Sequence, residues 1–238
     1  MPLTCVSRRL VFALVLAVLF GGAPVAGCKR KKAAPASSLS GGGVPRVRVI
    51  HALADGPAVD VYASNVKIVS GLAYKADTGY LAALPGTFTV RATAAGSNET
   101  AYGPAPVTLA GGTDYTVVVA GSVTGKNVQP LILTDDKAPP LPGRARVRVV
   151  HAAAPDAPPV DLLLNDRVAI SNLKFGQATG AYAEFPAGTY QLKVASVGGE
   201  TVVLGPLPLA LASGRTYTVL VLGRAADRTL NVQTLTDR

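Results

Sequence analysis

Two histidines and two aspartates are the residues of this chain whose types and spacing could do chemistry. His51 and His151 are the only histidines among the 238 residues, and Asp60 and Asp161 follow them at similar distances along the chain. An imidazole beside a carboxylate can transfer a proton or hold a polar ligand. His51, Asp60, His151 and Asp161 are therefore the candidate ligand-binding residues.

These side chains do not complete a recognisable metal or catalytic site. A zinc site needs several nitrogen or sulfur ligands, and each half of the chain supplies a single imidazole. Asp55, Asp156, Asp135 and Asp136 could add carboxylates for calcium, but the ordered ligand spacing of calcium loops is missing. We therefore expect no catalytic residues, no metal site and no cofactor.

Strand alternation gives both histidines a structural interpretation as well. His51 follows Val47 and Val49 at every second position, and His151 follows two valines in the same way. Alternate residues of a strand share one face, so each imidazole would be buried at a strand end with its nitrogens hydrogen-bonded. The aspartates lie beside prolines, a combination that fixes turns through hydrogen bonds from backbone amides.

The histidines belong to a motif that occurs twice. Residues 46–52 read RVRVIHA and residues 146–152 read RVRVVHA, and further matches follow in the same order. Matching pairs include Pro57 and Pro158, Val59 and Val160, Asp60 and Asp161, Tyr115 and Tyr217, and Thr116 and Thr218. Chance does not produce such collinearity, so the chain holds two modules of about 90 residues each.

The spacing of apolar runs within each module predicts the fold class. In the first module the runs cover residues 47–51, 59–62, 78–84, 87–92, 115–120 and 128–133, separated by Gly, Pro, Asn and Asp. No segment beyond the N-terminal region keeps a helical period. We predict an all-β chain with two tandem immunoglobulin- or fibronectin-like antiparallel β-sandwiches, in which Tyr115 and Tyr217 are corner tyrosines that bond to nearby backbone.

The predicted boundaries follow from the repeat. The first sandwich covers residues 44–134 and the second covers residues 144–238. Between them, residues 135–143 are rich in proline and should act as a semi-rigid spacer.

The N-terminus has the order of an export signal. Arg8 and Arg9 precede an apolar run from Leu10 to Phe20, which is shorter than the ~20 residues of a spanning helix. Residues 25–28, Val-Ala-Gly-Cys, resemble a bacterial lipobox. Residues 1–27 are thus predicted to be a lipoprotein signal peptide, with lipid attached to Cys28. The alternative is a plain secretory signal followed by a stray cysteine.

The segment after Cys28 explains most of the net charge. Residues 28–43 are predicted to be a flexible basic tether, and Lys29 resembles a sorting signal for the outer membrane if the cell is Gram-negative. The formal charge is +9, but Arg8, Arg9 and the four basic residues at 29–32 supply six of the 23 cations. The remaining 17 face 14 acidic residues, which is too weak a balance for binding nucleic acid.

The repeated motif resembles a known family. The order Arg-Val-Arg-Val-x-His-Ala, a turn rich in Pro and Asp, Val-Asp, and then Leu-Pro-Gly-Thr-Phe or Phe-Pro-Ala-Gly-Thr-Tyr is similar to the bacterial domain-of-unknown-function family 4397. The first copy departs from it at residues 53–56, Leu-Ala-Asp-Gly. The resemblance implies a secreted or anchored protein of the cell envelope, with no assigned activity.

These observations together predict a non-enzymatic, membrane-anchored cell-envelope lipoprotein. Its tandem sandwiches would serve as a binding or structural spacer unit, with the membrane and an envelope protein or glycan as partners. A glycan- or peptidoglycan-binding protein is the first alternative, for which Tyr62, Tyr74 or Tyr182 would supply stacking surfaces in the absence of Trp. An envelope enzyme is the second alternative.

Overall fold

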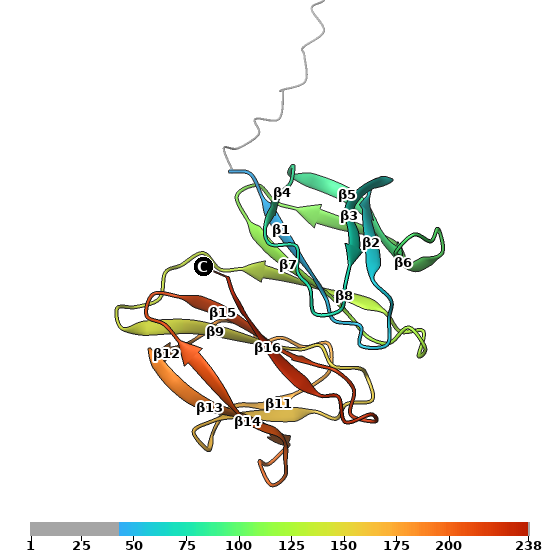
Figure 1. Ribbon diagram of the computed structural model, residues 1–238. Coiled ribbons are helices and arrows are strands. Elements are labelled where there is room, and N and C mark those ends of the chain that lie inside the picture. Colours follow the sequence, from blue (N-terminus) through green and yellow to red (C-terminus); the bar gives the residue numbers. More distant parts are fainter. Residues whose placement is uncertain (1–42, 238) are drawn as a thin grey trace, which may run out of the picture. The chain divides into compact units, whose positions relative to one another are not determined.

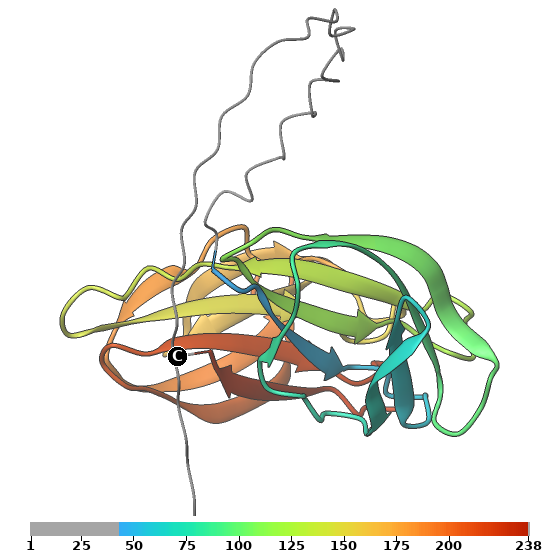
Figure 2. The same cartoon turned by 90° about the horizontal axis from the view of Figure 1, so that it is seen from above.

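The structure, a computed structural model, describes residues 43–237 and is built of strands (Figures 1 and 2). The signal peptide, Cys28 and the tether before Gly43 lie outside the described residues. Within residues 43–237 no helix could cross a membrane.

The first module, called repeat 1 below, is a sandwich of two four-stranded sheets. One sheet has the order β4-β1-β7-β8 and the other the order β3-β2-β5-β6. The strands are β1 (Arg46–His51), β2 (Val59–Ala63), β3 (Val66–Leu72), β4 (Leu81–Ala82), β5 (Gly86–Ala94), β6 (Thr100–Leu109), β7 (Asp114–Ala120) and β8 (Gln129–Asp135).

The second module, repeat 2, has the same topology. Its sheets have the orders β12-β9-β15-β16 and β11-β10-β13-β14. The strands are β9 (Arg144–His151), β10 (Val160–Leu164), β11 (Arg167–Leu173), β12 (Ala183–Pro186), β13 (Gly188–Ser196), β14 (Val202–Leu211), β15 (Thr216–Leu222) and β16 (Asn231–Thr236). The prediction of two β-sandwiches is confirmed, with one refinement: β1 pairs with β7, and β9 with β15, in parallel.

Two strands of repeat 1, β3 and β6, do not correspond to any of the apolar runs in the sequence. Strand β6 contains Pro104 and Pro106, which lack the amide of a central strand but are tolerated at a sheet edge. Gly103, just before Pro104, has a positive φ of 85°, and a Cβ there would lie 2.5 Å from the carbonyl oxygen of Val90. Only glycine therefore fits at this point of the pairing between β5 and β6.

The corner tyrosines behave as the sequence predicts. The backbone amide of Ala110 donates to the Tyr115 hydroxyl at 3.0 Å, and that of Ala212 donates to the Tyr217 hydroxyl at 3.0 Å. Each bond ties the loop before a central strand to that strand's first residues.

The two repeats pack directly on one another, and the role of residues 135–143 as a semi-rigid spacer stays a prediction. A buried apolar cluster joins side chains of both repeats: Ile50, Ala52, Val118, Ala120, Val150, Ala152, Leu220 and Leu222. The connecting segment is itself held, since Arg146 donates to Asp136 at 2.5 Å and to the carbonyl oxygen of Ala138 at 2.7 Å. Residues 43–237 accordingly lie in one compact unit.

Candidate functional site

A cavity of about 410 Å³ opens between the two sheets of repeat 1. Strands β1 and β7 line one side, and strands β2 and β5 line the other. The side chains that face it from these strands are Val47, Val49, Val117, Val119, Val61, Ala63, Val90 and Ala92. The residues that line the cavity are almost all aliphatic or aromatic, and none is charged.

The cavity exists because repeat 1 carries small side chains where repeat 2 carries large ones. Equivalent cross-strand pairs show this: Val61 lies opposite Ala92 in repeat 1, where repeat 2 has Leu162 opposite Val194. The next pair along is Ala63 with Val90 in repeat 1 and Leu164 with Leu192 in repeat 2. In repeat 2 these side chains fill the interior, and the corresponding space is about 10 Å³.

An aromatic ring completes the contrast between the two interiors. Ala83 donates its amide to Pro45 at the start of β1, the place at which Phe185 pairs with Ala145 at the start of β9. Phe185 packs into the core of repeat 2 and makes an edge contact with Tyr190. Ala83 lines the cavity instead.

The open cavity leaves apolar side chains in contact with solvent. Removal of apolar surface from water is favourable by about 25 cal/mol per Å². An apolar occupant would therefore gain free energy by covering these walls.

Large apolar side chains on the strands around the cavity are exposed to solvent. Leu84 is 74% exposed, and Ile68, Leu81 and Ile132 are each more than 40% exposed, while all four line the cavity. Contiguous exposed apolar surface of this kind is typical of sites that bind a partner or ligand.

A second cavity, of about 450 Å³, follows the first along the strands of repeat 1. Three strands, and the segment that enters β8, contribute one residue to it and the residue two positions away to the first cavity. These pairs are Val59 and Val61, Ala94 and Ala92, Thr100 and Tyr102, and Val128 and Pro130. Unlike the first cavity, the second has charged residues in its lining, Glu99 and Lys126.

The two histidines lie outside the linings of these cavities and are fully buried. His51 lies 2.9 Å from the carbonyl oxygen of Pro57 through Nε2, and its Nδ1 accepts the amide of Leu53 at 3.2 Å. His151 makes the equivalent contact with Pro158 at 3.3 Å. Burial lowers the pKa of both imidazoles, so both are neutral and hold the turn that follows their strand.

The two predicted aspartates also bind backbone. Asp60 accepts hydrogen bonds from the amides of Gly71 and Gly96 and forms an ion pair with Lys67 at 2.6 Å. The contact with Lys67, followed by the amide hydrogen bonds, lowers the pKa of Asp60 to about 2. Asp161 accepts the amides of Asn172 and Gly198 at 2.7 and 2.9 Å. The ligand-binding role of His51, Asp60, His151 and Asp161 remains a prediction, and their observed contacts are structural.

The remaining aspartates considered for calcium are also engaged by protein groups. Asp55 accepts from the hydroxyls of Ser122 and Thr124, and Asp156 accepts the amide of Ala226. Over residues 43–237 no group of three His, Cys, Asp or Glu side chains is placed to hold a metal ion.

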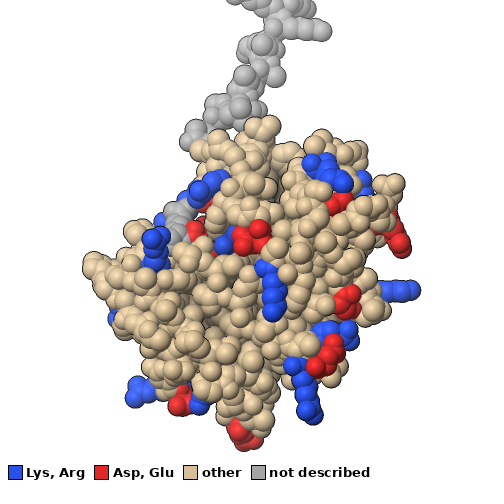
Figure 3. Space-filling model, viewed as in Figure 1, with Lys and Arg blue, Asp and Glu red and all other residues tan. Residues whose placement is uncertain are grey.

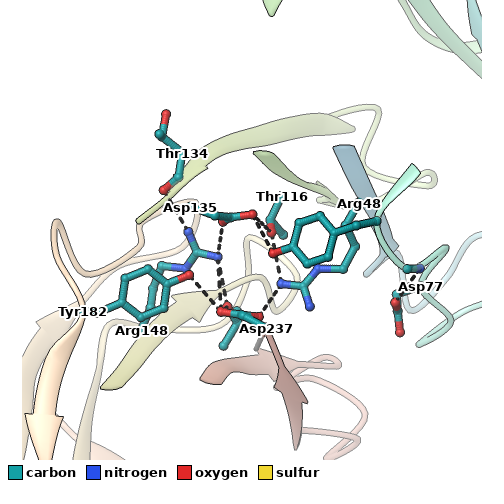
Figure 4. A network of polar contacts seen from close by, with 11 residues as sticks. Arg48, Asp77, Thr116, Thr134, Asp135, Arg148, Tyr182 and Asp237 are labelled. Atoms are coloured by element: carbon teal, nitrogen blue, oxygen red, sulfur yellow. Dashed lines mark hydrogen bonds and ion pairs between the residues drawn. The ribbon is translucent and has the colours of Figure 1, made fainter. Parts of the chain in front are cut away.

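A network of charged side chains also joins the two repeats (Figure 4). Arg48 of repeat 1 donates to Asp237 of repeat 2 at 2.5 Å, and Arg148 of repeat 2 donates to Asp135 of repeat 1 at 2.7 Å. All four side chains are at least 94% buried. Each repeat therefore supplies the carboxylate that neutralises the other's guanidinium.

Tyrosine and threonine hydroxyls complete this network in the same symmetric way. Tyr80 donates to Asp135 at 2.7 Å, and Tyr182 donates to Asp237 at 2.8 Å. Burial raises the pKa of both phenols, so both remain protonated donors. Tyr182 was a candidate stacking surface for a sugar, and this is wrong because the residue is only 9% exposed and Arg148 lies over its ring.

Comparison with known proteins agrees with the repeat. The family described as Domain of unknown function (DUF4397) matches residues 45–155 and 152–238. The chain belongs to the DUF4397 family. The two matched segments are consistent with two tandem domains of this family. Curated proteins gave no match.

Proposed function

We propose that this DUF4397 protein is a non-enzymatic, lipid-anchored protein of the bacterial cell envelope that binds a hydrocarbon chain inside repeat 1. The observation that carries the proposal is the cavity of about 410 Å³, walled by aliphatic side chains, in one of two otherwise equivalent sandwiches. Its size falls within the ~300–1,000 Å³ of typical ligand pockets.

The chemistry of the walls favours a hydrocarbon over a polar ligand. A sugar or peptide buried among Val47, Val61, Val90 and Val119 would lose its hydrogen bonds to water without finding replacements. Each methylene of an alkyl chain buried there gains about 0.8 kcal/mol. A hydrocarbon chain is therefore the best-matched occupant.

Repeat 2 acts in this proposal as a rigid support. The interior of repeat 2 is filled. Its sheet β12-β9-β15-β16 packs, through the shared cluster, on one face of the repeat 1 sheet β4-β1-β7-β8. That sheet forms one wall of the cavity, so its attachment to repeat 2 keeps the wall in place when the interior is only partly filled.

The envelope location rests on the N-terminal sequence. A signal peptide ending at residue 27 and lipid on Cys28 would place the tandem sandwiches at a membrane, the outer one if the cell is Gram-negative. Cys28→Ser should then move the chain from the membrane pellet to the soluble fraction and abolish incorporation of labelled palmitate. Retention of both properties would refute the anchor.

The glycan-binding alternative has less support from the tyrosines. Arg91 lies 3.8 Å over the ring of Tyr62, which occupies one stacking face, and Lys67 lies 5.5 Å from the same ring. On the face of the molecule in Figure 3, basic and acidic side chains are interspersed, and neither sign forms a broad patch for a charged polymer.

A filled-cavity variant tests the binding proposal. Ala63→Leu with Ala83→Phe copies Leu164 and Phe185 of repeat 2 into the equivalent positions of repeat 1. Palmitate should displace a bound fluorescent fatty acid from residues 40–238. The filled-cavity variant should bind palmitate at least about tenfold more weakly and should unfold at a higher temperature.

The control for this test is Ala210→Leu, which makes the same Ala-to-Leu change as Ala63→Leu at an exposed position of β14. This control should bind as the unchanged protein does. Equal binding by the filled-cavity variant and the control would refute the site, because palmitate would then bind elsewhere.

A further inference from the structure

The second cavity of repeat 1 bears on the kind of molecule that carries the hydrocarbon chain. The two cavities follow one another along β5, from Phe88 through Ala92 to Ala94. At ~3.3 Å per residue these residues span about 20 Å, with the apolar cavity at the Phe88 end and the cavity that has charged residues at the Ala94 end. A ligand that fits both cavities has an apolar tail and a polar head.

The polar end presents one charge of each sign. Glu99 lies just before β6, and Lys126 lies in the turn between β7 and β8; both line the second cavity and are exposed. Among residues 43–237, neither side chain takes part in a salt bridge. Both charges are therefore available to contact a ligand. Leu53, Val59 and Val128 line the same cavity and offer apolar contacts below these charges.

We infer that the ligand is a single-chain zwitterionic amphiphile, with its alkyl tail in the first cavity and its head group between Glu99 and Lys126. The inference rests on the proposed function, since it places a head group on the hydrocarbon chain proposed above. An ammonium group would face Glu99, and a phosphate would face Lys126. A volume of about 410 Å³, near the low end of the ~300–1,000 Å³ range, suits one alkyl tail rather than two.

Repeat 2 offers charges of the same signs beside an interior that is filled, which gives a matched control. Arg228 occupies the turn equivalent to that of Lys126, with the same left-handed backbone, φ 56° against 53°. Glu200 lies in the turn before β14, as Glu99 lies before β6. Removal of either pair of charges alters exposed residues alone, so both double variants should fold.

The experiment compares three probes with equal tails, measured by displacement of a fluorescent fatty acid from residues 40–238. The probes are zwitterionic lysophosphatidylethanolamine, anionic lysophosphatidylglycerol and an uncharged alkyl alcohol. The unchanged protein should prefer the zwitterion by about threefold to tenfold. Glu99→Gln with Lys126→Asn should remove this preference while alkyl alcohol binds as before, and Glu200→Gln with Arg228→Asn should retain it.

The outcomes separate the two proposals. If all three probes bind equally well and the Glu99 and Lys126 double variant changes nothing, the head-group site is refuted while the hydrocarbon site stands. If no probe binds the unchanged protein, both proposals are refuted. A preference for lysophosphatidylglycerol would also overturn the inference, because Lys126 alone would then select the head group.

Discussion

The two repeats are alike where they meet and unlike in their interiors. At the shared face, Arg48 and Arg148 occupy equivalent positions and each pairs with a carboxylate of the other repeat. Inside, Val61, Ala63 and Val90 stand where repeat 2 has leucines, and a cavity of about 410 Å³ lies beside a smaller packed core. The same fold therefore accommodates an open cavity in repeat 1 and a filled interior in repeat 2.

The difference shows what each part of the sequence controls. Turns, corner tyrosines and buried histidines are common to both repeats and fix the backbone. A few methyl and methylene groups on facing strands then decide whether the space between the sheets is filled. A change of function between the repeats needs no change of fold.

The largest effect should come from breaking the feature that the repeats share. Arg148→Met leaves Asp135 buried without the guanidinium that neutralises it, which should lower the free energy of unfolding by about 3–5 kcal/mol. Arg48→Met does the same to Asp237 and should cost a similar amount. Urea denaturation of both variants measures the two costs, and a loss below about 1 kcal/mol for either would contradict the buried network.

The next effect should distinguish the two interiors. Leu192→Ala opens a new cavity in the packed core of repeat 2 and should cost about 2–5 kcal/mol. Val90→Ala, at the equivalent position of repeat 1, enlarges a space that is already open and should cost about 1 kcal/mol. Thermal and urea unfolding provide the comparison. Equal costs at the two positions would mean that repeat 1 is as well packed as repeat 2.

A smaller, pH-dependent effect should be common to both repeats. Burial lowers the pKa of His51 and His151 in the folded state, whereas the unfolded chain takes up protons near the ordinary value of 6.5. Stability is therefore full above that pH and falls as the pH drops below it, by up to about 1.4 kcal/mol per pH unit for each histidine. Urea denaturation at about pH 7.5 and about pH 5.5 measures this slope.

His151→Gln tests the assignment of the slope to the histidines. Its Nδ1 has no hydrogen-bond partner among the described residues, unlike that of His51, so the imidazole of repeat 2 is the less firmly held. The variant should retain about half of the pH dependence. A slope unchanged by the substitution would assign the effect to other groups.

The repeat, the sandwich class and the corner tyrosines could be predicted because each depends on local or collinear patterns. Alternation also placed His51 on the inner face with Val47 and Val49. Alternation alone puts Arg48 on the outer face, where solvent would be expected, but that face is buried by repeat 2. The signal was the unbroken apolar run from Val117 to Val119, typical of a strand covered on both faces.

The cavity could not be predicted from single positions. Valine and alanine at Val61, Ala63 and Ala92 are ordinary core residues, and no one of them indicates a space. The space results from the summed volumes of side chains that face one another, which depends on strand register. The edge strands β3 and β6 were missed because exposure and prolines obscure their alternation.

Methyl NMR on bound ligand tests the central claim most directly. Residues 40–238 with labelled valine and leucine methyl groups, saturated with palmitate, should show nuclear Overhauser contacts from the alkyl chain to Val61 and Val90. The equivalent residues Leu162 and Leu192 of repeat 2 should show none. Contacts to both pairs of residues, or to neither pair, would contradict the assignment of the binding site to the interior of repeat 1.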